Sequence, residues 1–194
     1  MGKTLSTWLK QHDPDIWFAI TRYLNWDNSF RTLKWIVSQP QCDKANAAKI
    51  FWSSDPAYYA CRIAKGQQLR PDEGGALIEL ILGNWRRGFY QRSELAWPSD
   101  GSSASIAYFH RETAAVPGAA SALDIPPEMF GPFSGRAPHV PPECTPQENV
   151  ELWDMLRRQG TSAGPRPGSD EWIAERAKAK SQPKRSGFWS RIFR

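Results

Sequence analysis

The chain has 194 residues, of which 40% are hydrophobic and 23% charged, and it contains 10 Trp and 16 Pro. This composition excludes a collagen-like or coiled-coil protein, and no stretch approaches the roughly 20 apolar residues of a membrane-spanning helix. The net charge of +5 would favour a nucleic-acid or membrane partner only if the basic residues lay on the folded body.

The positive charge is concentrated at the end of the chain. Residues 157–194 hold ten Lys or Arg against three Asp or Glu, a net charge of +7, whereas residues 1–156 hold fifteen against seventeen, a net charge of −2. A specific nucleic-acid-binding domain is expected to carry its own basic face, so we expect no specific nucleic acid as partner. The basic end supports only weak, salt-sensitive contact with anionic surfaces.

The three cysteines predict neither a disulfide framework nor a metal site. Cys42, Cys61 and Cys144 are far apart in sequence, and no CxxC pair or spaced His pair accompanies them. No apolar core of a secretory signal follows Lys3 and Lys10. We therefore expect a cytoplasmic protein with reduced thiols, without a metal or cofactor.

Short helices are predicted along the first half of the chain. Each has apolar residues at helical spacing, and most begin at an Asp N-cap, in two cases with Pro at the first helical position. The predicted starts are Asp13-Pro14, Phe30, Asp43, Asp55-Pro56 and Pro71-Asp72-Glu73.

The pattern changes after Trp97-Pro98. Residues 100–103 predict a loop, residues 105–110 a short strand or helix edge, and the Pro-rich stretch 117–146 an extended segment that wraps the core or is loose. A helix is then predicted over 146–158, with Thr145 as cap and Glu148 completing a capping box, and a polar helix over 169–180.

Together these elements predict a mainly α fold. Residues 1–98 are expected to form a compact bundle of short helices, residues 99–146 a Pro-rich extended segment, and residues 147–194 appended helices and a basic tail.

The first region carries a recognisable series of motifs: an Asn25-Trp26-Asp27-Asn28 turn, an apolar helix containing Trp35-Ile36-Val37, a Pro40-Gln41-Cys42-Asp43 turn and a helix ending in Ile50-Phe51-Trp52. Over roughly residues 12–98 the chain resembles a bacterial domain of unknown function, family 4274. It departs from the family pattern at Lys44-Ala45-Asn46-Ala47, where small residues of the Gly-Thr-Ala type are expected after the turn. The resemblance implies a small helical domain and brings no reaction, cofactor or catalytic residue.

The candidate motif residues are Asn25, Trp26, Asp27, Cys42 and Asp43. Asp27 and Asp43 could meet in one site, and Cys42 at a helix start could be a nucleophile. Alternatively, Asp27 forms a turn, Asp43 is an N-cap and Cys42 packs in the core. The structural interpretation is favoured for all three.

Two further groups are candidate contact residues. The aromatic and basic segment Trp85, Arg86, Arg87, Tyr90 and Trp97 has the residue types enriched at interfaces, although Trp residues equally serve a core. The tail residues fit three interpretations: a plain solvated tail, a short amphipathic anchor at a membrane surface, or a peptide that docks on a partner. These residues are Lys184, Arg185, Phe188, Trp189, Arg191, Ile192, Phe193 and Arg194.

No catalytic constellation is apparent, so the leading hypothesis is a non-catalytic cytoplasmic module that binds another protein, such as an immunity or adaptor protein. An enzyme using Asp27, Cys42 and Asp43 is the first alternative. Membrane-surface or nucleic-acid association through the tail is the second.

Overall fold

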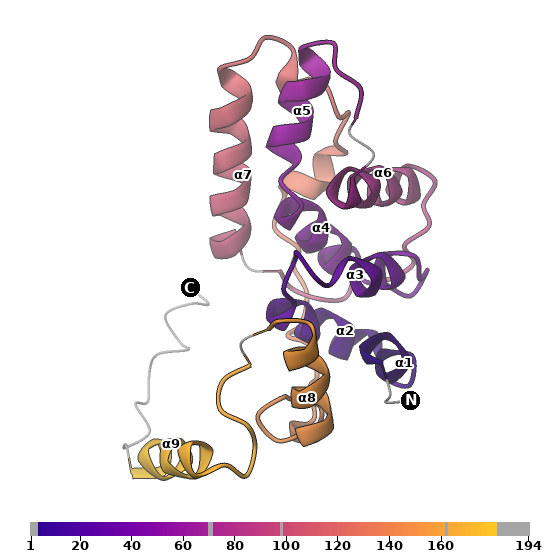
Figure 1. Cartoon of the computed structure of the whole chain (residues 1–194). Helices are drawn as coiled ribbons and strands as arrows, with labels where there is room; N and C mark the ends of the chain where they lie inside the picture. The colour runs from indigo at the N-terminus through magenta and orange to yellow at the C-terminus, as the bar shows by residue number, and fades with distance from the viewer. Residues whose placement is uncertain (1–3, 70–71, 98, 162, 182–194) are drawn as a thin grey trace.

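The computed structural model describes residues 4–69, 72–97, 99–161 and 163–181. The described chain is mainly helical, which confirms the predicted fold class (Figure 1). Its longer helices are α1 (Leu5–Leu9), α2 (Pro14–Ile20), α3 (Phe30–Val37), α4 (Lys44–Ser53), α5 (Pro56–Ala64), α6 (Glu73–Arg86), α7 (Ser99–Ala114), α8 (Val150–Arg158) and α9 (Asp170–Ser181). Short 3-10 turns are η1 (Thr21–Tyr23), η2 (Ala119–Ser121), η3 (Pro127–Phe130) and η4 (Pro142–Cys144).

Aspartate caps start four of these helices, and three of them, Asp13, Asp43 and Asp55, were predicted. The carboxylates of Asp13, Asp43 and Asp72 each accept a backbone N–H of the first helical turn at 2.9 Å. Asp55 caps α5 with a longer bond, 3.4 Å from the Tyr58 N–H. Such bonds satisfy the N–H groups that a helix start leaves without partners.

The expected loop at 100–103 is wrong, because these residues are part of the helix α7. Of the two alternatives for 105–110, a short strand or the edge of a helix, the structure has the helix. Phe109 on this helix is buried, with its ring 5.5 Å from that of Trp52 and 6.0 Å from that of Phe130. This packing outweighs the weak helix propensity of the Ser and Gly residues.

The helix predicted over 146–158 starts later, at Val150. Its cap is Asn149, whose side chain accepts the Leu152 N–H at 2.9 Å. The hydroxyl of Thr145 instead donates to the Pro142 carbonyl at 2.7 Å, which closes the preceding turn. The predicted capping box is therefore absent.

The Pro-rich residues 115–146, here named the strap, wrap the helical core. The indole of Trp52 donates to the Met129 carbonyl at 2.8 Å, and Met129 is fully buried. Farther along, the Arg136 N–H donates to the Glu94 carbonyl at 2.9 Å. A Cβ on Gly135 would lie 2.3 Å from that carbonyl oxygen, so only glycine permits this approach.

A buried carboxylate attaches the strap to α2. Asp15 is 2% exposed, and it accepts the side chain of Arg136 and the backbone N–H of His139, the latter at 2.7 Å. Arg92 adds a further bond at 3.4 Å. Burial alone would raise the pKa of Asp15, but these donors, led by Arg136, leave it below its ordinary value.

One continuous core extends across the boundary predicted at residue 98. It includes Phe51 and Ile81 from the first region, Phe109 from α7, Met129 from the strap and Leu156 from α8. In Figure 1, α7 runs alongside α5. The Trp172 indole attaches α9 to the segment before α8, because it donates to the Gln147 carbonyl at 2.8 Å.

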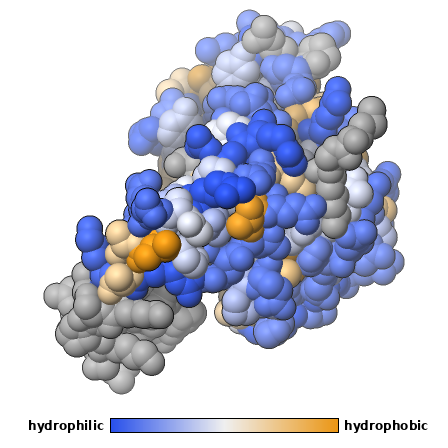
Figure 2. Space-filling model, turned by 60° about the horizontal axis from the view of Figure 1, so that its bottom comes forward, coloured by the Kyte–Doolittle hydropathy of each residue, from blue (hydrophilic) through white to orange (hydrophobic). Residues whose placement is uncertain are grey.

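Within the described residues, no helix has the length and apolar character needed to cross a membrane. The face seen in Figure 2 is mostly hydrophilic, with hydrophobic residues in small separate patches.

Candidate functional site

The Asn25-Trp26-Asp27 turn has one internal and one exposed part. The Asn25 side chain accepts the Asp27 N–H at 3.0 Å, and its own backbone N–H donates to the Thr161 hydroxyl at 3.2 Å. Asn25 therefore holds the turn and joins it to the residues after α8. Trp26 is half-buried against the core, whereas Asp27 is exposed.

Asp43 has a different environment, because it is buried and fully engaged. Besides capping α4, its carboxylate accepts the N–H groups of Glu94 at 2.7 Å and Leu95 at 3.3 Å. These bonds attach the extended segment 91–97 to the start of α4. Asp43 thus satisfies three backbone donors, which is a structural role.

Cys42 is fully buried beside Asp43. Burial, with a contribution from the Asp43 charge, raises the pKa of its thiol far above the ordinary value. A neutral buried thiol packs as a small apolar side chain and is a poor nucleophile. His12, the histidine nearest in sequence, instead stacks on Trp8 with ring centroids 3.7 Å apart.

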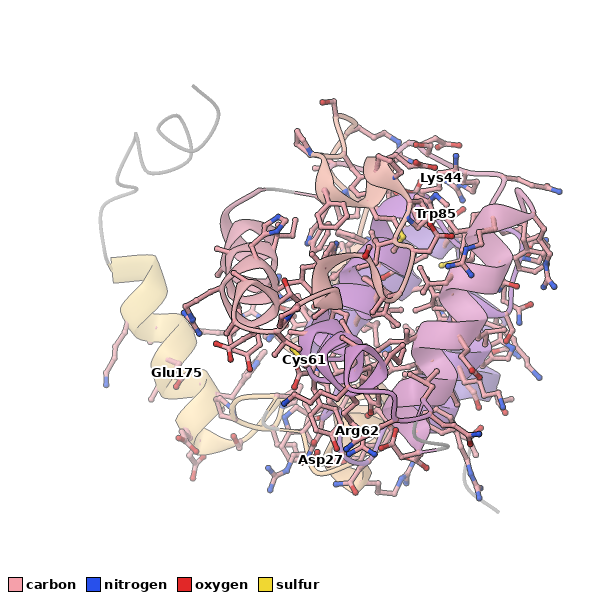
Figure 3. All side chains as sticks on the ribbon, turned by 90° about the horizontal axis from the view of Figure 1, so that it is seen from above. Asp27, Lys44, Cys61, Arg62, Trp85 and Glu175 are labelled. Atoms are coloured by element: carbon pink, nitrogen blue, oxygen red, sulfur yellow. The ribbon has the colours of Figure 1, made fainter. Side chains whose placement is uncertain are left out.

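The structure does not bring Asp27 together with Cys42 and Asp43. Figure 3 shows Asp27 and Lys44, the residue after Asp43, on opposite sides of the helical body. The two carboxylates therefore belong to different parts of the molecule.

The second candidate group is mostly internal. Trp85, Tyr90 and Trp97 are all less than 9% exposed. The Trp85 indole donates to the Glu128 carboxylate at 2.7 Å, and the Tyr90 hydroxyl donates to the Val37 carbonyl at 3.1 Å. Burial also raises the pKa of Tyr90. These three rings therefore contribute to the core rather than to a contact face.

Arg86 and Arg87 are the exposed part of that group, and both guanidinium groups are engaged. Arg86 donates to the carbonyls of Leu123 and Asp124 at 2.8 and 2.9 Å, while Arg87 donates to the Asn84 side chain. The tail residues from Lys184 to Arg194 lie outside the described residues.

An open cavity of about 480 Å³, here named the acidic groove, lies between the turn before α3, the end of α4 and the start of α6. Trp26, Phe30 and Leu77 provide its apolar surface. Its carboxylates are Asp27, Asp55, Asp72 and Glu73, and no Lys or Arg is among its lining residues.

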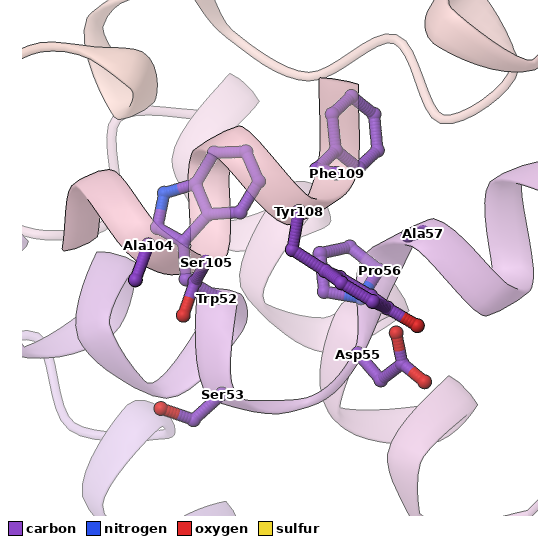
Figure 4. Close-up of a pocket in the computed structure, with 9 residues that line it drawn as sticks. All are labelled: Trp52, Ser53, Asp55, Pro56, Ala57, Ala104, Ser105, Tyr108 and Phe109. Carbon is purple, nitrogen blue, oxygen red and sulfur yellow. The ribbon is translucent and has the colours of Figure 1, made fainter. Parts of the chain in front are cut away.

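A second open cavity of about 390 Å³, here named the α7 groove, lies between the α4–α5 junction and α7 (Figure 4). Trp52, Pro56 and Phe109 form much of its apolar wall, and Tyr108 stands at one side. Figure 4 shows the hydroxyl end of Tyr108 directed toward the Asp55 carboxylate. The negative charge of Asp55 raises the pKa of Tyr108.

The two grooves meet at the α4–α5 turn, because Ser53 and Asp55 line both. Asp55 adopts a left-handed backbone conformation with φ 53° and ψ 57°, which is uncommon outside glycine. Tyr58 and Tyr108 beside it are 39% and 41% exposed, whereas the other Phe, Trp and Tyr side chains of the described residues are buried or half-buried. We name the two grooves with these two tyrosines the Asp55 surface.

Sequence reasoning found Asp55 only as a helix cap. No local sequence pattern predicts the left-handed conformation of this turn. The groove is equally unpredictable from local sequence, because its lining residues come from separate elements. Tyr108 was missed because its segment was expected to be a short strand or the edge of a helix, which did not place it beside Asp55.

No group of three or more His, Cys, Asp or Glu able to hold a metal ion occurs among the described residues. The carboxylates of the acidic groove therefore do not form a coordination site.

The fold and surface define a small helical protein with two adjoining open grooves. Residues 12–73 match the model of a family described as a domain of unknown function, DUF4274, which confirms the predicted resemblance over that stretch. The match ends before the predicted limit at residue 98, and it includes all residues lining the acidic groove except Gly74 and Leu77. No curated protein and no solved structure matches the chain.

Proposed function

We propose that this protein is a non-catalytic module that binds another protein through the Asp55 surface. The observation that carries the proposal is the meeting of two open grooves at one turn, with exposed Tyr108 lining one groove and exposed Tyr58 bonded to Asp55 through its backbone N–H. Tyrosine is enriched among the residues that contribute most to binding energy, and grooves accept the side chains of a partner.

The chemistry of the candidate nucleophile also supports binding rather than catalysis. Cys42 is buried with a raised pKa, and Asp43 is occupied by three backbone donors. An enzyme built on Asp27, Cys42 and Asp43 has no supporting geometry. An immunity or adaptor role in the cytoplasm is the specific form of the proposal.

The test compares partner capture by the full-length protein and two variants in source cells. Tyr58→Ala/Tyr108→Ala removes both exposed rings, and Val150→Ala is the matched control, since Val150 is 38% exposed on α8. We expect the wild type and the control to retain one stoichiometric protein and the double variant to lose it. Equal retention by all three would contradict the proposal.

A further inference from the structure

We infer that the acidic groove binds a basic segment of the partner protein, with Lys or Arg side chains placed around one apolar or aromatic anchor. This inference rests on the proposed function and assigns a chemistry to one half of the Asp55 surface. It is based on the combination of charge and apolar surface within one cavity.

The acidic groove is negatively charged. Asp27 and Glu73 are exposed, and neither has an ion-pair partner among the described residues. Asp55, also exposed, accepts the Tyr58 backbone N–H and lies beside the Tyr108 hydroxyl, with no ion-pair partner among the described residues. Three exposed like charges around one cavity, Asp27, Asp55 and Glu73, repel one another and attract a cationic ligand.

The acidic groove also has an apolar surface. Trp26 and Phe30 are half-buried and pack against the core, so they present part of each ring to the cavity. A volume of about 480 Å³ lies within the range of about 300–1,000 Å³ typical of ligand sites. Aromatic faces also attract cations, particularly Arg and Lys.

The carboxylates of the acidic groove come from different elements of the fold. Asp27 precedes α3, Asp55 separates α4 from α5, and Glu73 begins α6. Three separate elements therefore surround the cavity, an arrangement that suits an extended ligand with several cationic groups. A single metal ion would need its ligands together, and no such group occurs in the described part of the chain.

The same charge argues against the other large ligands. Nucleic acids and anionic membranes present phosphate groups, which these carboxylates would repel. A basic peptide segment is the macromolecular ligand whose charge and apolar content both complement the groove.

The test measures fluorescence anisotropy of a labelled heptapeptide in which three arginines flank a Trp-Leu pair. The control peptide carries citrulline, a neutral isostere, in place of each arginine. Against the full-length protein, we expect the arginine peptide to bind about tenfold tighter than the citrulline peptide, because only the former carries charge. Raising the salt concentration is expected to reduce this difference.

Two variants locate the binding. Asp27→Asn/Glu73→Gln removes two charges that cap no helix and should weaken arginine-peptide binding about fivefold. Glu79→Gln, on the same helix as Glu73, lines a different cavity and should leave binding unchanged. Absence of peptide binding, equal binding of both peptides, or equal binding by the groove variant and wild type overturns the inference.

Partner capture separates this inference from the proposed function. If the partner is lost with Tyr58→Ala/Tyr108→Ala but retained with Asp27→Asn/Glu73→Gln, the module binds through its tyrosines and the basic ligand is rejected. If the partner is retained by both variants, the proposed function itself fails.

Discussion

Two sides of this molecule use acidic residues in opposite ways. On the strap side, Asp15 and Asp43 are buried and surrounded by donors from distant segments. On the side of the Asp55 surface, Asp27 and Glu73 are exposed and have no ion-pair partner in the described structure. The difference indicates that carboxylates of one side maintain the fold, while those of the other remain available for a ligand.

The largest expected effect comes from Asp43→Ala. This change removes the cap of α4 and leaves the buried N–H groups of Glu94 and Leu95 without an acceptor. A lost cap costs about 1 kcal/mol and an unsatisfied buried donor about 1–3 kcal/mol, so we expect a loss of about 3–4 kcal/mol. Urea unfolding measures it. Asp27→Ala is the matched control, and a comparable loss in that variant would remove the distinction between the two sides.

Asp15→Asn is expected to cost about 2–3 kcal/mol, because it leaves Arg136 and Arg92 without their buried carboxylate. The expected loss of stability is kept to this size because the Arg136 side chain is half-exposed, so water can solvate its charge. Limited proteolysis should show earlier cleavage within the strap, which this carboxylate attaches to α2. Glu94→Gln, which alters an exposed acid bound to the same arginines, should cost distinctly less than Asp15→Asn.

The Asp15 contribution also has a predicted pH dependence. Its folded pKa is lowered from 3.8, so the stabilisation is present above the unfolded pKa and disappears as the pH falls through the folded pKa. The stability difference between wild type and Asp15→Asn should therefore be constant near neutrality and shrink only in strong acid. A difference that disappears already near pH 6 would contradict this assignment.

Replacing the largely buried cation of Lys49 is expected to have a smaller effect, and it should stabilise the protein. Lys49 donates to the Thr21 hydroxyl at 2.8 Å, and burial, with repulsion from Arg22, lowers its pKa from 10.5 to about 8. Between these values the unfolded chain binds a proton that the folded chain does not, so this residue makes stability rise with pH. Lys49→Met should lack that rise and be about 1 kcal/mol more stable at pH 7. Thermal unfolding of both proteins from pH 7 to 9.5 measures the difference, and parallel curves would contradict it.

These results bear on what the sequence could predict. The helix starts at Asp13, Asp43 and Asp55 were predictable because a cap and its helix lie within a few residues. The full length of helix α7 was not predictable, because the helix packs through Phe109 against Trp52, and these two residues are far apart in the chain. Local composition cannot report such a contact.

The path of the strap and the position of the grooves share this limit. The Pro residues predict a segment without α-helix, since each fixes φ and lacks a donor. The strap, which lies within the described residues, contains only the short 3-10 turns η2, η3 and η4 as helical elements. The attachment of Arg136 to Asp15 joins positions more than a hundred residues apart. Likewise, the carboxylates of the acidic groove come from separate elements, so their proximity arises only when the helices pack.

The smallest expected effect on stability is that of Asp27→Asn/Glu73→Gln. Neither side chain caps a helix or forms an ion pair within the described residues, and removing two charges from an acidic groove relieves repulsion. We expect the free energy of unfolding to change by less than about 0.5 kcal/mol, because the relief of repulsion is offset by the loss of the Glu73 charge from the first turn of α6. Urea unfolding at low and high salt measures this. A loss above about 1 kcal/mol would mean that these acids also maintain the fold. Unchanged stability together with weaker binding of the arginine peptide would separate acids that serve a ligand from acids that serve the structure.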